Sequence, residues 1–124
     1  MPSGHASAPG RYGNPDLVVA HQCNSVFYIC DGVVTVLLGK GDGTFQEPVA
    51  YGSGGFVSFS VVVADVNNDG KPDLIASNEY GGVSPGGVPP DPGGVGVLLG
   101  NGDGTFHAAV SYASGGCFQW VSLT

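Results

Sequence analysis

The feature that most constrains this chain is an internal repeat. The segment VTVLLGKGDGTFQEPVAYGSGG at residues 34–55 returns as VGVLLGNGDGTFHAAVSYASGG at residues 95–116, which is 61 positions later and without a gap. A shorter match, PDLVVA at 15–20 and PDLIAS at 72–77, is separated by 57 positions. Similarity of this kind indicates two copies of one supersecondary unit. The chain is therefore expected to fold as two similar units, with four extra residues in a loop of the second.

Each unit divides into four apolar segments whose length and patterning are typical of β-strands. The second unit has them at 57–64, 73–78, 95–99 and 105–112, and the first unit has them at 16–21, 33–38 and 44–51. The first unit is expected to lack its first strand, because residues 8–13 contain no acid where an acidic loop would follow that strand. The chain end at 117–124 aligns with 56–63 and is expected to be a further first strand. The eight strands would then form two four-stranded antiparallel units that are offset by one strand.

Composition favours an all-β fold in a single domain. A chain of 124 residues can enclose one modest core. Its 23 Gly and 9 Pro residues interrupt every window in which apolar residues recur at helical spacing, so essentially no helix is expected. Since the apolar residues fall in strand-like runs, the Gly content indicates turns rather than disorder.

The charge balance excludes one class of partner. Three basic residues against ten acidic ones give a net charge of −7, whereas nucleic-acid binding needs clustered Lys and Arg. The sequence has no apolar run of 18 residues, and its start, MPSGHASAPGRYG, has neither the basic region nor the apolar centre of a signal peptide. Neither nucleic acid nor membrane insertion is expected.

An acidic loop separates two apolar runs in the sequence VVVADVNNDGKPDLIASN at residues 61–78. Side-chain oxygens fall at loop positions 1, 3, 5 and 9, and position 7 can add a carbonyl; these residues are Asp65, Asn67, Asp69, Asp73 and Lys71. Calcium takes six to eight such oxygens. An EF-hand is excluded, because its position 12 would be Ala76 and strands flank the loop. Calcium binding is the favoured interpretation, and a solvated Asn/Asp-rich turn is the alternative.

The sequence resembles the FG-GAP, or VCBS, repeats of integrin-α-like β-propellers. The residues that carry the resemblance are VADVNNDGKPDL at 63–74 and the two copies of LLGxGDGTF. The resemblance implies that each unit is a propeller blade, with a first blade at 14–55, a second at 56–116, and residues 117–124 completing a neighbouring blade. It also implies that the acidic loop binds calcium. Only one unit keeps the acids, and two blades do not close a ring of four to eight.

Other motifs favour ordinary structural roles. Asp42-Gly43 and Asp103-Gly104 lie between β segments and are typical of two-residue hairpin turns. No nucleophile elbow or Cys–His pairing is apparent, so no active site and no enzymatic activity are expected. Asp16, the one acid that the first unit keeps, is interpreted as a strand-end residue.

The three cysteines divide unevenly. Cys23 and Cys30 flank a short segment in the long connection between the second and third strands of the first unit, where a disulfide would close a loop. Such a pair favours an oxidising, extracellular setting. Cys117 is left as a free thiol or as a bond to another chain.

The long connections at 22–32 and 79–94 leave the same end of the two units, opposite the acidic loop. They contain Phe27, Tyr28 and Tyr80, and exposed aromatics on variable loops suit recognition of a protein or glycan. Locally packed aromatics are the alternative interpretation.

Two units of this size leave strand edges and apolar faces uncovered. The segment 117–124 of one copy is expected to pair beside 16–21 of the next, which gives a ring or a filament. Two functions follow: an extracellular adhesion or recognition module, or a structural subunit whose assembly is the function.

Overall fold

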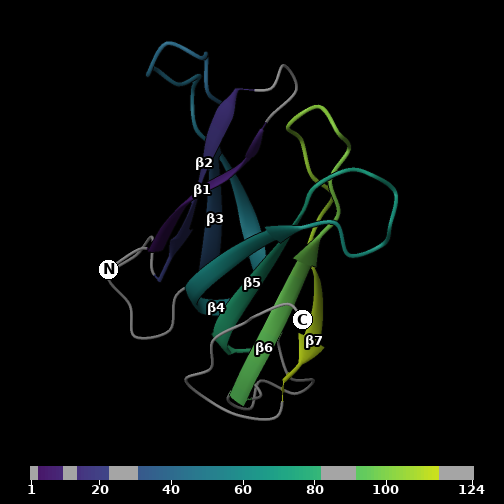
Figure 1. Ribbon diagram of the computed structural model, residues 1–124. Coiled ribbons are helices and arrows are strands. Elements are labelled where there is room, and N and C mark those ends of the chain that lie inside the picture. The colour runs from purple at the N-terminus through teal and green to yellow at the C-terminus, as the bar shows by residue number, and fades with distance from the viewer. Residues whose placement is uncertain (1–2, 10–13, 23–30, 82–91, 115–124) are drawn as a thin grey trace.

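The computed structural model describes residues 3–9, 14–22, 31–81 and 92–114. It contains seven strands: β1 Ser3–Pro9, β2 Pro15–His21, β3 Asp31–Leu37, β4 Val49–Ala64, β5 Asp73–Tyr80, β6 Pro92–Leu98 and β7 Val110–Ala113 (Figure 1). The expectation of an all-β chain is confirmed for the described residues. None of them belongs to a helix capable of crossing a membrane.

The seven strands form one antiparallel sheet in which each strand pairs with its neighbours in the sequence, from β1 to β7. The repeat is visible in the register. Leu17 of β2 lies opposite Leu37 of β3, and at the equivalent positions of the second unit Leu74 of β5 lies opposite Leu98 of β6. The two similar sequences therefore fold into two similar strand pairs.

A single strand, β4, connects the two units. Its first half pairs with β3, where Val49 lies opposite Val36, and its second half pairs with β5, where Val63 lies opposite Leu74. The strand bends between these halves, where Gly54 and Val57 both have positive φ angles of 87° and 54°. Figure 1 shows β4 curling from the β3 side of the sheet to the β5 side. The segment expected at 57–64 lies within this bent strand, but the segment expected at 44–51 joins it only at residues 49–51. Likewise only residues 110–112 of the segment expected at 105–112 lie in β7; before these points Phe45 and Phe106 each make an isolated bridge, because the chain is still leaving its Asp-Gly turn.

The expectation that the first unit lacks its first strand is wrong. β1 occupies that place and pairs with β2 from Ser3 opposite Ala20 to Pro9 opposite Pro15. Its sequence, SGHASAP, has few residues that favour strands, so the backbone ladder to β2 is what defines it. Because β2 lies between β1 and β3, it has no free edge, and the expected pairing of 16–21 with the segment 117–124 of a neighbour would require β1 to leave. Residues 117–124 themselves lie outside the described residues.

The core lies where the two units meet. On β2 and β3 the buried apolar side chains alternate with more exposed ones, as expected for strands with one covered face. The buried cluster draws on both units and consists of Val18, Ala20, Val34, Val36, Val61, Leu74, Ala76 and Leu98. One face of the first unit is therefore packed against one face of the second.

Polar side chains are also buried, around β5. Ser53 donates a hydrogen bond of 2.7 Å to the Asn78 side chain, which donates one of 3.1 Å to the Ser53 carbonyl. The hydroxyls of Ser60 and Ser77 lie 2.8 Å apart and form a second pair. Among the described residues no buried side-chain nitrogen or oxygen lacks a partner, so these groups are compatible with a core position.

Candidate metal centre

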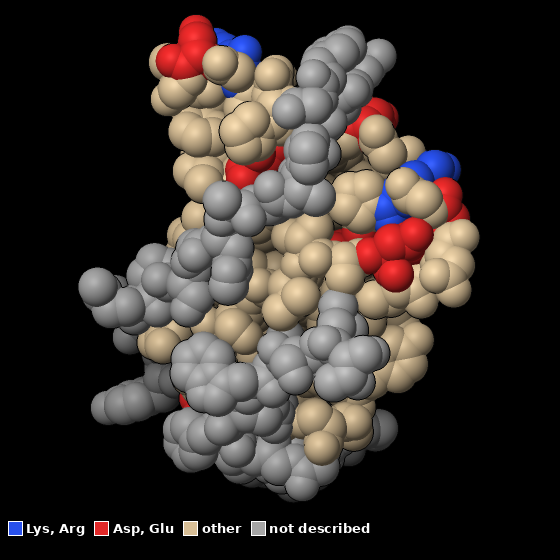
Figure 2. All heavy atoms as spheres, viewed as in Figure 1, with Lys and Arg blue, Asp and Glu red and all other residues tan. Residues whose placement is uncertain are grey.

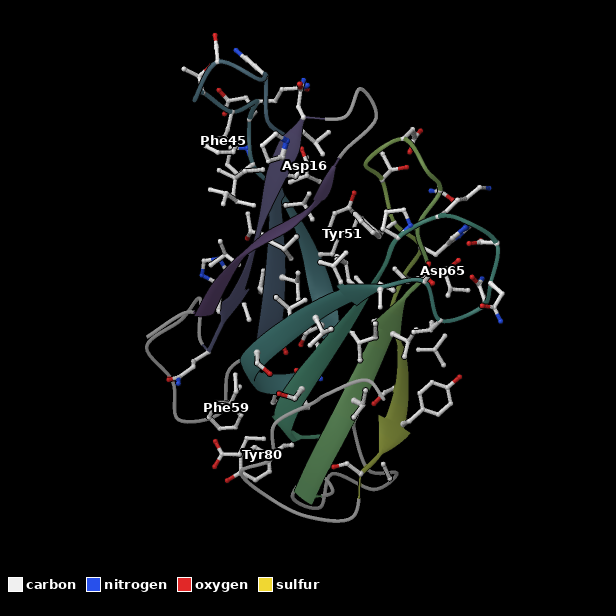
Figure 3. All side chains as sticks on the ribbon, in the orientation of Figure 1. Asp16, Phe45, Tyr51, Phe59, Asp65 and Tyr80 are labelled. Carbon is white, nitrogen blue, oxygen red and sulfur yellow. The ribbon has the colours of Figure 1, made fainter. Side chains whose placement is uncertain are left out.

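The acidic loop leaves the sheet directly after the last pair of β4 and β5, in which Ala64 lies opposite Asp73. Asn68 and Gly70 have φ angles of 59° and 80°, so the loop turns sharply at both residues. Glycine takes such angles without strain, and Asn tolerates them better than most residues. The loop stands at the side of the sheet, where Figure 3 labels Asp65.

Three of the predicted ligands lie together. Asp65, Asp69 and Asp73 can each offer one carboxylate oxygen, and these oxygens lie within 4.8 Å of one another. Figure 2 shows acidic atoms gathered at this side of the molecule. Among the described residues no other group of three His, Cys, Asp or Glu side chains has this arrangement. The structure thus brings together the acids that the loop spacing selected.

The loop backbone holds the Asp65 carboxylate. The amide of Gly70 donates to Asp65 Oδ2 at 2.8 Å, and the amide of Asp69 donates to Asp65 Oδ1 at 3.2 Å. These donors, with the Gly70 amide first, lower the pKa of Asp65 below its ordinary value. A second turn bond of 2.9 Å runs from the Lys71 amide to Asp69 Oδ1. The Asp65 carboxylate is therefore held charged, and the loop's own amides hold the Asp65 and Asp69 side chains in place.

The amide group of Asn67 lies between two of these carboxylates. In one orientation its nitrogen donates to Asp65 Oδ1 and to Asp69 Oδ1, both at 3.0 Å. In the other orientation the amide oxygen takes the nitrogen's position, and three oxygens then converge with no proton between them. The first arrangement suits an ion-free loop, whereas the second suits a bound cation. Asn67 can thus supply the fourth side-chain oxygen.

Asp73 has a structural role that the sequence did not indicate. It is fully buried, and its Oδ2 accepts a hydrogen bond of 2.9 Å from the Val66 amide. Its Oδ1 accepts one of 2.8 Å from the amide of Gly100, which lies just beyond β6. A carboxylate oxygen retains a second lone pair for a cation. Asp73 therefore ties the acidic loop to the connection between β6 and β7.

The equivalent residue of the first unit, Asp16, makes the equivalent contact. Its Oδ1 accepts a hydrogen bond of 2.8 Å from the amide of Gly39, which corresponds to Gly100 in the repeat. Asp16 is the second residue of β2 and is buried, so its interpretation as a strand-end residue is confirmed. In the acidic loop of the second unit, the backbone carbonyl of Lys71 stays a predicted calcium ligand.

The two Asp-Gly turns are confirmed, but each encloses three residues rather than two. The amide of Lys40 donates to the Thr44 carbonyl at 2.9 Å, so the turn comprises residues 41–43. Inside it, the amide and the hydroxyl of Thr44 both donate to Asp42, and Thr105 does the same for Asp103. The Thr44 hydroxyl, followed by its amide, lowers the pKa of Asp42. These acids serve the turns.

The expected recognition face is described only in part. Tyr80 is the last residue of β5, so it lies at the end of that strand opposite Asp73 and the acidic loop (Figure 3). The structure corrects its expected position in a loop, because β5 continues through Tyr80, which pairs with Pro92 at the start of β6. Four residues of the earlier predictions lie outside the described residues: Phe27, Tyr28 and the proposed disulfide partners Cys23 and Cys30. Cys117 lies outside them as well.

Comparison with known families places this geometry in context. Residues 13–76, more than half of the chain, match the family model described as an FG-GAP-like repeat. Residues 58–98, which include the acidic loop, match the model described as an FG-GAP repeat. No match was found among curated proteins or among solved structures.

Proposed function

Because this chain belongs to the FG-GAP repeat family, we propose that it is a non-enzymatic, calcium-binding module of the β-propeller type that acts in extracellular adhesion or recognition. FG-GAP repeats are propeller-like modules, typically without enzymatic activity and often found in extracellular recognition proteins. In this proposal the two units are two blades that meet at the shared strand β4.

The observation that carries the calcium proposal is the convergence of oxygen atoms in the acidic loop. The carboxylate oxygens of Asp65, Asp69 and Asp73 lie within 4.8 Å of one another, and Asn67 can add an amide oxygen. Calcium accepts hard oxygen ligands in flexible geometry, and the Lys71 carbonyl would be a fifth. Three carboxylates around a divalent cation leave a net charge near −1. The donor set therefore fits calcium.

The ion would supply positive charge where the fold places three acids. It would reduce the repulsion between the carboxylates and fix the start of β5 relative to the end of β4. Through its hydrogen bond with the Gly100 amide, Asp73 would also fix the position of the connection after β6. The calcium end of the second unit would then be rigid, and the opposite end, with Tyr80, would carry the recognition surface for a protein or glycan.

The test is thermal unfolding with and without calcium, for the natural chain, Asp69→Ala and Glu47→Ala. Glu47 is an exposed acid outside the loop, so its replacement controls for the loss of one negative charge. For a dissociation constant on the order of 10⁻⁴ M, calcium at about 100 times that concentration stabilises by about 2.7 kcal/mol. The natural chain and Glu47→Ala should melt higher with calcium, whereas Asp69→Ala should not. Identical melting curves of the natural chain with calcium and with chelator would refute the site.

A second candidate function is that of a structural subunit. The exposure of Tyr112 on β7 and of Phe45 on the opposite unit favours it, because such apolar surface is usually covered by a partner. Two units do not close a propeller ring, whereas several copies could form a ring or a filament. In sedimentation, a discrete trimer or tetramer would favour the recognition module, and an open polymer would favour the structural subunit.

A further inference from the structure

The two units contact each other through aromatic and aliphatic side chains that occur in both. The rings of Tyr51, on β4, and Phe106 make a T-shaped contact with a centroid distance of 5.6 Å and an interplanar angle of 83°. Leu38 lies against Gly104, where an added Cβ atom would come within 2.7 Å of Leu38 Cδ1. Side chains of the first unit thus pack against a complementary surface of the second unit.

We call these surfaces the projecting face and the receiving face. The projecting face of the first unit consists of Val34, Val36, Leu38 and Tyr51. The receiving face of the second unit consists of Leu74, Leu98, Gly104 and Phe106. Their buried members belong to one core cluster, so this contact is the interface between the units.

The repeat places a second projecting face on the outer side of the second unit. Its residues are Val95, Val97, Leu99 and Tyr112, each 61 positions after its counterpart. The backbone geometry is the same, since Val95 lies opposite Tyr112 as Val34 lies opposite Tyr51. The burial differs. Val34 and Val36 are buried, whereas Val95 and Val97 are only half-buried. Leu38 and Tyr51 are partly buried against the core, whereas Leu99 is 36% and Tyr112 57% exposed.

A second receiving face lies on the outer side of the first unit. Its residues are Leu17, Leu37, Gly43 and Phe45, which correspond to Leu74, Leu98, Gly104 and Phe106. Leu17 and Leu37 pair in the same register as their counterparts but are only half-buried. Phe45 is 36% exposed. A Cβ atom added to Gly43 would have no other atom within 4 Å, whereas one added to its counterpart Gly104 would meet Leu38. In Figure 3 Phe45 stands at the outer side of the first unit, away from Tyr51.

We propose that a second copy of this chain covers these surfaces, with the projecting face of one copy seated on the receiving face of the next. The occupant is identified by the internal interface, which shows that this projecting sequence fits this receiving sequence. The contact joins two different surfaces, so it leaves one of each free and continues into a ring or a filament. The proposal deepens the self-association part of the proposed function and replaces the expected edge pairing with a face contact.

Sedimentation over a concentration series tests this with two variants of β7. Tyr112→Asp places a charge in the proposed contact. Val110→Asp is the matched control: Val110 is 54% exposed on the same strand, and its counterpart Val49 stays 50% exposed beside the internal interface. The natural chain should associate, Tyr112→Asp should weaken the association about tenfold or more, and Val110→Asp should leave it nearly unchanged. Equal losses in both variants would refute the assigned surface.

Mixing two variants tests the contact by a gain of association, so the test does not depend only on variants that fail to associate. Tyr112→Asp keeps a functional receiving face, and Phe45→Asp keeps a functional projecting face. At a concentration where the natural chain associates, each variant alone should be mostly monomeric. The mixture should form a complex of one copy of each, which misfolded chains would not do. A monomeric natural chain up to about 1 mM, or a mixture that stays monomeric, would overturn the proposal. Calcium-dependent melting is measured on the same samples to separate the two proposals. If the chain is monomeric but is still stabilised by calcium, only the self-association is refuted and the calcium site stands.

Discussion

Replacing Asp73 with Ala should destabilise the fold even when no calcium is present. The carboxylate is fully buried and accepts hydrogen bonds from the amides of Val66 and Gly100. The contact with Gly100 is buried, so its amide would lose its partner without access to water, at a cost of about 1–3 kcal/mol. Val66 is exposed and its amide can turn to water, which adds about 1 kcal/mol or less. The total expected loss is about 1–4 kcal/mol.

The matched variant is Asp16→Ala in the first unit. It removes the bond with the Gly39 amide, which is partly buried, so the expected loss is about 1–2 kcal/mol. Both variants are compared with the natural chain by urea unfolding in excess chelator, where a shifted midpoint with an unchanged slope reports stability. If Asp73→Ala unfolds within about 0.5 kcal/mol of the natural chain, or if Asp16→Ala costs more, then the hydrogen-bonding role assigned to Asp73 is wrong.

Two further predictions concern the packing and the turns. Gly96→Ala should destabilise by about 2–4 kcal/mol in urea unfolding, because the new Cβ would meet the Ser53 carbonyl oxygen at 1.7 Å. Gly52→Ala should change stability little, because nothing lies within 4 Å of an added Cβ there. Comparable losses in the two variants would show that the close contact of Gly96 with Ser53 does not limit stability. Because the pKa of Asp42 is lowered, its contribution to stability is present above its ordinary pKa of about 3.9 and is lost as the pH falls through the lowered value. Thr44→Val should raise that pKa in an NMR titration, and an unchanged pKa would show that the Thr44 hydroxyl is not its main cause.

The parts of the fold that the sequence predicted are those that the repeat specifies twice. The segments expected at 16–21 and 73–78 fall within β2 and β5, and those at 33–38 and 95–99 match β3 and β6 to within a few residues. In each case an apolar run follows or precedes a Gly-rich turn, so local pattern and turn chemistry agree.

The sequence could not predict β1 for a physical reason. Its residues include Gly, two Ala and Pro, none of which favours a strand, and the strand exists through backbone bonds to β2. Pattern recognition detects side chains that suit a pleated surface, and it does not detect a backbone ladder whose partner lies elsewhere in the chain.

The candidate site was predicted in its residue types but not in its internal bonds. Spacing selected Asp65, Asp69 and Asp73, which the fold does bring together. It did not reveal that Asp73 accepts a bond from Gly100, 27 residues away. One signal was present: the first unit has lost the other acids but keeps Asp16, so an acid at this position serves the strand end even where no cation is expected.

The most direct measurement of the central claim is the number of calcium ions bound per chain, by isothermal titration calorimetry on chelator-treated protein. Because only the second unit has the acids, the account predicts one ion per chain, and none in a variant that combines Asp65→Ala with Asp69→Ala. No binding to the natural chain, or one ion still bound by the double variant, would contradict it.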